Sequence, residues 1–120
     1  MSNYDTMMIG ESPVEEQCAQ VGTVGYFDRA MKECNALIAQ LNRMHGQPPE
    51  GVRLYVQDNP HDFGTYHTVD ARFPVGDDAA YEYVLKLEGG LPEYWDATAL
   101  RELYPDWDEE RMQTEIEKRS

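Results

Sequence analysis

The stretch YFDRAMKECNALIAQLNRMH, residues 26–45, decides the fold. Its apolar residues recur at steps of three and four, which is the period of one face of an α-helix; they are Phe27, Ala30, Met31, Cys34, Leu37, Ile38, Leu41 and Met44. The opposite face is polar and is expected to contact solvent, and it holds Asp28, Arg29, Lys32, Glu33, Gln40 and Arg43. Gly46 and Pro48 then end the helix. A stripe of this width must be buried, so the rest of the chain has to supply a partner surface.

Two stretches that follow the helix alternate apolar and polar side chains. They are Val52–Gln57 and Thr65–Phe73, and this period of two is typical of half-buried β-strands. Turn-forming residues fill the stretch between them, from Asp58 to Gly64. We therefore predict an antiparallel hairpin packed on the 26–45 helix through Val52, Leu54, Val56, Val69 and Phe73.

Shorter helices are predicted on both sides of this unit, over residues 12–21, 77–88, 96–104 and 107–118. The stretch 77–88 also fits a third strand, but Asp77 at its start and Gly89 at its end favour the helix. Asp96 and Asp106 are the predicted caps of the last two helices. The fold class predicted by this pattern is α+β, a long amphipathic helix on an antiparallel hairpin with shorter flanking helices.

The length of 120 residues predicts one domain over residues 1–120. Residues 1–11 are expected to form a flexible tail, and residues 107–120 a mobile C-terminal helix. No apolar run approaches the roughly 18 residues of a membrane span, and the first ten residues lack the features of a secretory signal. Cys18 and Cys34 form no metal-binding motif, so we expect buried thiols in a reducing cytoplasm.

The charge balance is the most informative part of the composition. Ten basic residues face 23 acidic residues, a net charge of −13. Residues 76–120 alone contain thirteen acids and five bases. Direct nucleic-acid binding is not expected, because it needs clustered Lys and Arg. A negative field of this size instead favours encounter with basic surfaces.

The C-terminal run mixes aromatic side chains with carboxylates, and this mixture is the main candidate site. A protein-binding face would use the rings as anchors and the acids as partners for Arg or Lys, and its residues would be Tyr94, Trp95, Asp96, Asp106, Trp107, Asp108, Glu109 and Glu110. A sharper version is nucleic-acid mimicry, in which spaced carboxylates occupy a basic groove. The alternative is a solvated acidic surface with Trp95 and Trp107 packed on the core.

A second candidate site is the predicted hairpin loop. His61 and Asp62, with His67 and Asp70 nearby, could form a metal site or an acid–base pair. The competing interpretation is that His61 and Asp62 are ordinary turn residues and that His67 lies at the edge of the core. Neither a cofactor nor a metal is expected, and Cys34 is expected to be an inert buried thiol.

Two further segments carry a resemblance. The stretches Asn59–Tyr66 and Glu88–Asp96 resemble small uncharacterised proteins of phages and mobile elements, over residues 26–96. The resemblance implies a context in which small acidic proteins bind host machinery, defence nucleases included. It assigns no functional residue.

These observations together predict a non-enzymatic, cytoplasmic acidic protein that binds a basic surface of a partner protein. The expected partner is a nucleic-acid-handling or defence complex, and the protein would act as a nucleic-acid mimic of the anti-CRISPR kind. Two alternatives remain open: a small enzyme centred on the hairpin loop, and a structural subunit or homodimer without a ligand.

Overall fold

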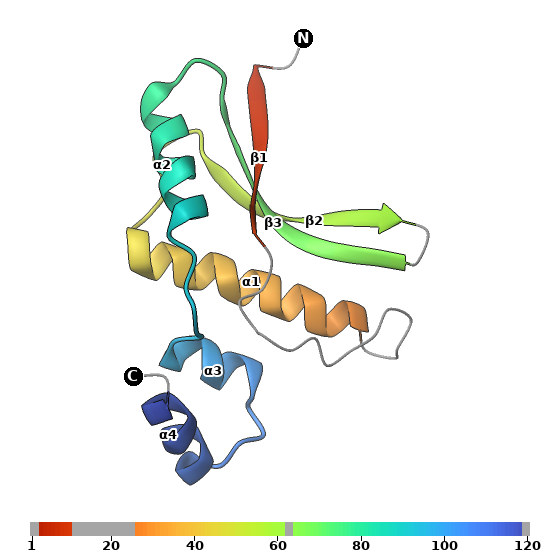
Figure 1. Cartoon of the computed structure of the whole chain (residues 1–120), viewed down its shortest axis with the longest axis vertical. Helices are drawn as coiled ribbons and strands as arrows, with labels where there is room; N and C mark the ends of the chain where they lie inside the picture. Colours follow the sequence, from red (N-terminus) through yellow and green to blue (C-terminus); the bar gives the residue numbers. More distant parts are fainter. Residues whose placement is uncertain (1–2, 11–25, 62–63, 119–120) are drawn as a thin grey trace.

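The protein has an α+β fold, shown in a computed structural model that describes residues 3–10, 26–61 and 64–118 (Figure 1). In chain order the described elements are β1 (Tyr4–Gly10), α1 (Tyr26–His45), β2 (Arg53–His61), β3 (Gly64–Pro74), α2 (Asp78–Gly89), α3 (Ala97–Leu103) and α4 (Glu109–Lys118). The three strands form an antiparallel sheet in the order β1-β3-β2. The predicted helix over residues 12–21 lies outside the described residues.

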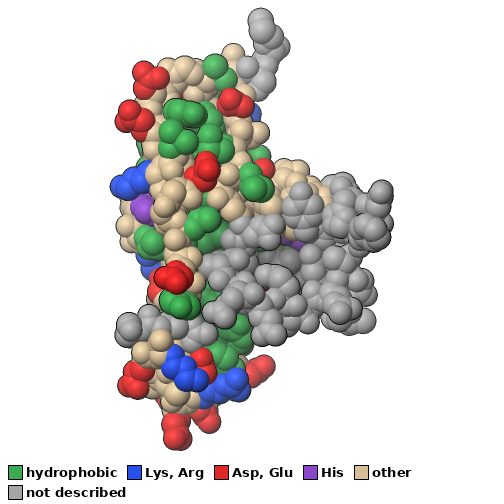
Figure 2. All heavy atoms as spheres, viewed as in Figure 1, with side chains coloured by type: hydrophobic (Ala, Val, Ile, Leu, Met, Phe, Trp, Pro, Cys, Tyr) green, Lys and Arg blue, Asp and Glu red, His purple; other side chains and the backbone are tan. Residues whose placement is uncertain are grey.

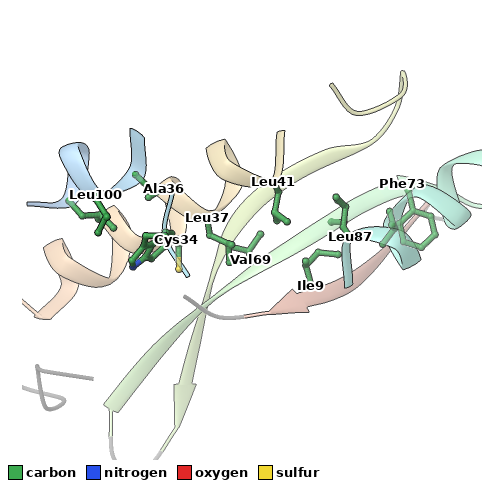
Figure 3. Close-up of a cluster of buried hydrophobic side chains, with 14 of the residues drawn as sticks. Ile9, Cys34, Ala36, Leu37, Leu41, Val69, Phe73, Leu87 and Leu100 are labelled. Atoms are coloured by element: carbon green, nitrogen blue, oxygen red, sulfur yellow. The ribbon is translucent and has the colours of Figure 1, made fainter. Parts of the chain in front are cut away.

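The core lies between one face of the sheet and the two helices α1 and α2. Val69, Ala71 and Phe73 alternate along the central strand β3 and are all buried. Leu37 from α1 and Leu87 from α2 are fully buried against this face. Figure 3 shows one continuous row of apolar side chains that runs from Leu100 through Leu37, Leu41 and Val69 to Ile9, Leu87 and Phe73. The predicted inward face of the hairpin is therefore confirmed.

The N-terminal segment is a strand over residues 4–10, and the flexible tail predicted for residues 1–11 is wrong over that range. β1 pairs with β3 from Tyr4 opposite Pro74 to Gly10 opposite Val69, with a register shift between Met8 and Gly10. Ile9 is buried in the core and Met7 packs against it. The short alternation of Met7 and Ile9 was the signal for this strand, and it covers too few residues to stand out beside the acidic stretch that follows.

The hairpin is longer than its sequence pattern predicts. Residues 58–64 were expected to form a loop, but the ladder continues through Asp58 opposite His67 to His61 opposite Gly64. Pro60 is tolerated because β2 is an edge strand, where one side of the backbone needs no partner strand. The Asn59 side chain donates to Gln57 O at 3.1 Å and to Thr68 Oγ1 at 3.1 Å, so a typical turn residue here stabilises the strand pair.

The helix α1 is covered on two sides, and this corrects its predicted solvent-facing polar side. Glu33 and Gln40, both expected in water, are 6% and 3% exposed. They lie on one side of the helix with the buried Ala36, and α3 contacts α1. Gln40 Nε2 donates to Tyr94 O at 3.0 Å, and Gln40 Oε1 accepts from Asp96 N at 3.0 Å. A buried amide thus fixes the segment before α3 to the long helix.

Replacement of this amide should be costly. In Gln40→Ala the carbonyl of Tyr94 and the N–H of Asp96 lose their partners, and we expect a loss of about 2 kcal/mol or more in the free energy of unfolding. Urea denaturation at neutral pH measures the loss. Gln113→Ala on exposed α4 is the matched control and should change stability by less than about 0.5 kcal/mol. Equal effects of the two substitutions would contradict the role assigned to Gln40.

The predicted helix starts are confirmed at two of three positions. Asp77 caps α2 by accepting from Ala80 N at 3.0 Å, and this settles the 77–88 stretch as helix. Asp96 caps α3 by accepting from Ala99 N at 2.8 Å. The cap of α4 is Asp108, not Asp106, because Asp108 Oδ1 accepts from Arg111 N at 2.7 Å. None of the described helices combines the length and hydrophobicity that crossing a membrane requires.

Candidate protein-interaction surface

Trp95 is part of the core and is not exposed to a partner. Its side chain is 5% exposed and belongs to the same buried cluster as Leu37 and Leu100. The residue lies in the segment that Gln40 ties to α1, which explains why the ring points inward. The sequence-based assignment of Trp95 as a surface anchor is therefore corrected in favour of the packing alternative.

Asp96 has structural partners on two sides. Arg43 reaches across from α1 and donates from Nε to Oδ2 at 2.9 Å and from Nη2 to Oδ1 at 2.8 Å, while Ala99 N donates to the same carboxylate. Partial burial raises the pKa of Asp96, but the hydrogen bonds from Arg43 and Ala99 and the guanidinium charge lower it further, so the net pKa lies below 3.8. This carboxylate stabilises the junction of α1 and α3 in its charged form.

The lowered pKa predicts a stability difference that depends on pH. Asn caps a helix as well as Asp does, so Asp96→Asn removes the charge and keeps the cap. Because the folded pKa lies below the unfolded value of 3.8, the charge contributes fully above that value, and its contribution is lost as pH falls through the folded pKa. The pair is about one-third exposed, so we expect a difference of up to about 1 kcal/mol at pH 7.

Urea denaturation of the wild type and Asp96→Asn at pH 7, 5, 4 and 3 measures this difference. It should be constant from pH 7 to 5 and shrink below about pH 4. A difference that stays the same at every pH would show that the charge of Asp96 is not its source.

The remaining aromatic and acidic candidates are divided between internal contacts and free surface. Trp107 is half-buried: it stacks on Tyr104 with ring centroids 4.2 Å apart, and Arg111 lies 4.5 Å from its ring centroid. Asp108 is the α4 cap, and Glu109 accepts from Arg101 at 2.7 Å. Tyr94, Asp106 and Glu110 are exposed, and none of them makes such an ion pair or ring contact with another described residue. Five of the eight predicted residues thus serve the fold.

A different helix, α2, presents exposed large apolar side chains next to exposed acids. Tyr81 and Leu85 lie one turn apart on α2 and are 45% and 41% exposed, which is high for large apolar side chains. At 100° per residue they share an arc of about 120° with three exposed acids. We call this arc the α2 outer face, and its members are Asp78, Tyr81, Glu82, Leu85 and Glu88.

The carboxylates of the α2 outer face have no partner among the residues that the structure describes. Asp78, Glu82 and Glu88 make no hydrogen bond through their side chains and no ion pair with another described residue, and Lys86 lies outside the arc. Figure 2 shows hydrophobic side chains gathered over α2 with acidic side chains around them. Tyr81 also contacts the core through Phe73, with ring centroids 5.9 Å apart, so its ring is held in place. An apolar centre with an acidic rim is typical of a protein-binding surface.

The sequence contains a signal for the α2 outer face in the spacing of its large apolar residues. As a helix, residues 77–88 group Ala80, Tyr83, Val84 and Leu87 on one face. Ala80, Val84 and Leu87 are buried, and Tyr83 is partly buried against the core. The same helix also puts Tyr81 and Leu85 outward, where large apolar side chains need an explanation.

The hairpin residues do not converge on a site within the described part of the chain. His67 is buried on the helix-covered face, with Nε2 3.1 Å from Asp58 Oδ1. Asp70 is three residues further along the same strand, so it faces the other side of the sheet, where it accepts from Thr68 Oγ1 at 2.8 Å. No group of three or more His, Cys, Asp or Glu is placed to hold a metal ion among the described residues. The His61 side chain and Asp62 lie outside them.

Fold and surface together define an α+β protein whose second helix presents an apolar and acidic face. Comparisons with protein-family models, with curated proteins and with solved structures find no match to this chain.

Proposed function

We propose that this protein is a non-enzymatic acidic binding protein that docks the α2 outer face on a basic surface of a partner protein in the cytoplasm. The proposal rests on the exposed side chains Tyr81 and Leu85, which lie between three carboxylates that pair with no other described residue. Large apolar side chains supply most of the energy of protein association when they are covered. The acids around them select Lys or Arg on the partner.

The net charge of the whole molecule also favours binding to a basic surface. A net charge of −13 on 120 residues raises the rate of encounter with a basic surface and opposes approach to nucleic acid. The C-terminal acids Asp106, Glu110 and Glu117 are exposed and add to this field at the far end of the chain. In this proposal they lie outside the contact, which α2 makes.

The partner class that fits this chemistry is a protein whose basic groove normally holds nucleic acid. The resemblance of residues 26–96 to phage and mobile-element proteins points to a host nucleic-acid-handling or defence complex. In that setting the carboxylates of Asp78, Glu82 and Glu88 stand in for phosphate groups. The protein would then inhibit its partner by occupying the groove.

Capture from host cells tests the proposal when the bait is paired with a charge variant. The full-length wild type and Glu82→Gln/Glu88→Gln are immobilised at equal density, and bound proteins are identified at about 0.1 M salt. We expect a basic protein that binds the wild type and is lost from the variant. Duplex DNA added to the complex should displace it in proportion to concentration.

Two outcomes would contradict the proposal. One is a partner that binds the wild type and the variant equally. The other is a partner that the wild type holds with unchanged affinity in excess duplex DNA, because a groove occupied by a mimic cannot hold both. Glu110→Gln/Glu117→Gln is the matched control, since it removes the same charge from α4 and should retain the partner.

A further inference from the structure

Two arginines lie side by side on the face of the sheet that is turned away from α1 and α2. Arg53 of β2 and Arg72 of β3 are directly opposite each other in the antiparallel register, and both are exposed. Arg72 is flanked along β3 by Ala71 and Phe73, which point into the core, so alternation places Arg72 on the outer side. Like charges directly opposite in a sheet repel each other. This pair would be stabilised by a negative charge between its members.

The described residues do not supply that charge. Neither guanidinium makes a hydrogen bond or ion pair with a described residue, whereas Arg43 and Arg101 each hold a carboxylate. Asp70 is on the same face as Arg72, but its carboxylate accepts from Thr68 Oγ1 at 2.8 Å and forms no ion pair with either arginine.

The two arginines border a shallow hollow of about 320 Å³, which is lined by Tyr4, Gly51, Val52, Arg53 and Arg72. The Arg72 guanidinium lies 4.2 Å from the centroid of the Tyr4 ring, and this cation–π contact orients it. Gly51 has a φ of +91°, and a Cβ there would come within 2.8 Å of Pro74 Cγ, so only glycine fits this wall. The hollow is therefore shaped by the backbone and by one oriented guanidinium.

We propose that this hollow binds a phosphate dianion, either free or as a phosphomonoester. Two guanidinium groups carry two positive charges, which a dianion balances and a single carboxylate does not. The planar donors of arginine also match the oxygens of phosphate in pairs. The site lies on the sheet face opposite to the one that α2 covers, so it does not depend on the partner proposed for the α2 outer face.

An NMR titration of the full chain with 15N-labelled arginine tests the site at pH 7.5, where a phosphomonoester is largely dianionic. Inorganic phosphate and phosphoserine are added in separate series at constant ionic strength, with sodium acetate as the monoanion control. We expect saturable shifts of the Arg53 and Arg72 Nε–H signals and little change at Arg101. Tighter binding of phosphoserine assigns the site to a phosphomonoester, and equal binding assigns it to free phosphate.

Variants decide whether the shifts report a site. Arg53→Gln and Arg72→Gln should each weaken phosphate binding about tenfold or more, because each removes a charge-assisted hydrogen-bond donor. Arg101→Gln is the matched control and should leave the affinity unchanged. Amide spectra show whether each variant is folded. Shifts that do not saturate, that acetate reproduces, or that persist in both variants would overturn the proposal.

Discussion

Trp95→Ala should lower the free energy of unfolding by about 3–5 kcal/mol, the range for removal of a large aromatic side chain from a core. The ring is 5% exposed and belongs to the cluster that joins α1 to α3. Deletion leaves a cavity at the point where the segment before α3 meets the long helix. Urea denaturation followed by far-UV circular dichroism measures the loss.

The neighbouring residue provides a matched control. Tyr94 is 45% exposed, and its contact with α1 is made by its backbone carbonyl, so Tyr94→Ala should cost less than about 1 kcal/mol. The loss expected for Trp95→Ala can exceed the total stability of a small domain. Trp95→Phe therefore provides a milder test, with an expected loss of about 1–2 kcal/mol in the free energy of unfolding. If Trp95→Ala retains wild-type stability and loses only partner binding, the ring is a surface anchor and its placement in the core is wrong.

The second large effect concerns the α2 outer face. Tyr81→Ala/Leu85→Ala should weaken binding of the captured partner about 30-fold or more, because truncation of one central tyrosine of an interface can by itself cost about 2 kcal/mol. Both side chains are more than two-fifths exposed, so the free protein should stay folded. The affinity is measured by titration calorimetry with the purified partner.

Tyr94→Ala serves as the control for binding as well. Tyr94 has the same 45% exposure as Tyr81 but lies between α2 and α3, so its removal should change the affinity by less than about threefold. If Tyr94→Ala abolishes binding and Tyr81→Ala/Leu85→Ala does not, the interface lies in the C-terminal run and not on α2.

The elements predicted from sequence are those whose periodicity extends over many residues. The stripe of α1 contains more than five helical steps, and the alternation of the hairpin is equally regular, so both were evident. The strand β1 was missed because only Met7 and Ile9 mark its inner face. The extension of β2 through Pro60 was missed because turn propensity is local, whereas tolerance of proline at an edge depends on sheet order.

The candidate site was less predictable for a physical reason. Composition shows that aromatics and acids are close in sequence, but not which of them the fold uses. Asp96 and Asp108 are good cap residues, and the fold uses both for that purpose. Gln40 has a polar side chain that the sequence pattern assigns to solvent, yet it is buried, and two hydrogen bonds to the segment before α3 satisfy its amide group. Only tertiary contacts distinguish these cases.

Binding through the acidic face of α2 can be tested by the salt dependence of partner affinity, measured for the wild type and for two charge variants. We expect wild-type affinity to fall steeply between about 0.1 M and 1 M salt, where the screening length drops from about 10 Å to about 3 Å. Glu82→Gln/Glu88→Gln should bind weakly at low salt and show a smaller salt effect, while Glu110→Gln/Glu117→Gln should stay close to the wild type. Affinity that is independent of salt, or equal in the wild type and Glu82→Gln/Glu88→Gln, would contradict binding through the acidic face of α2.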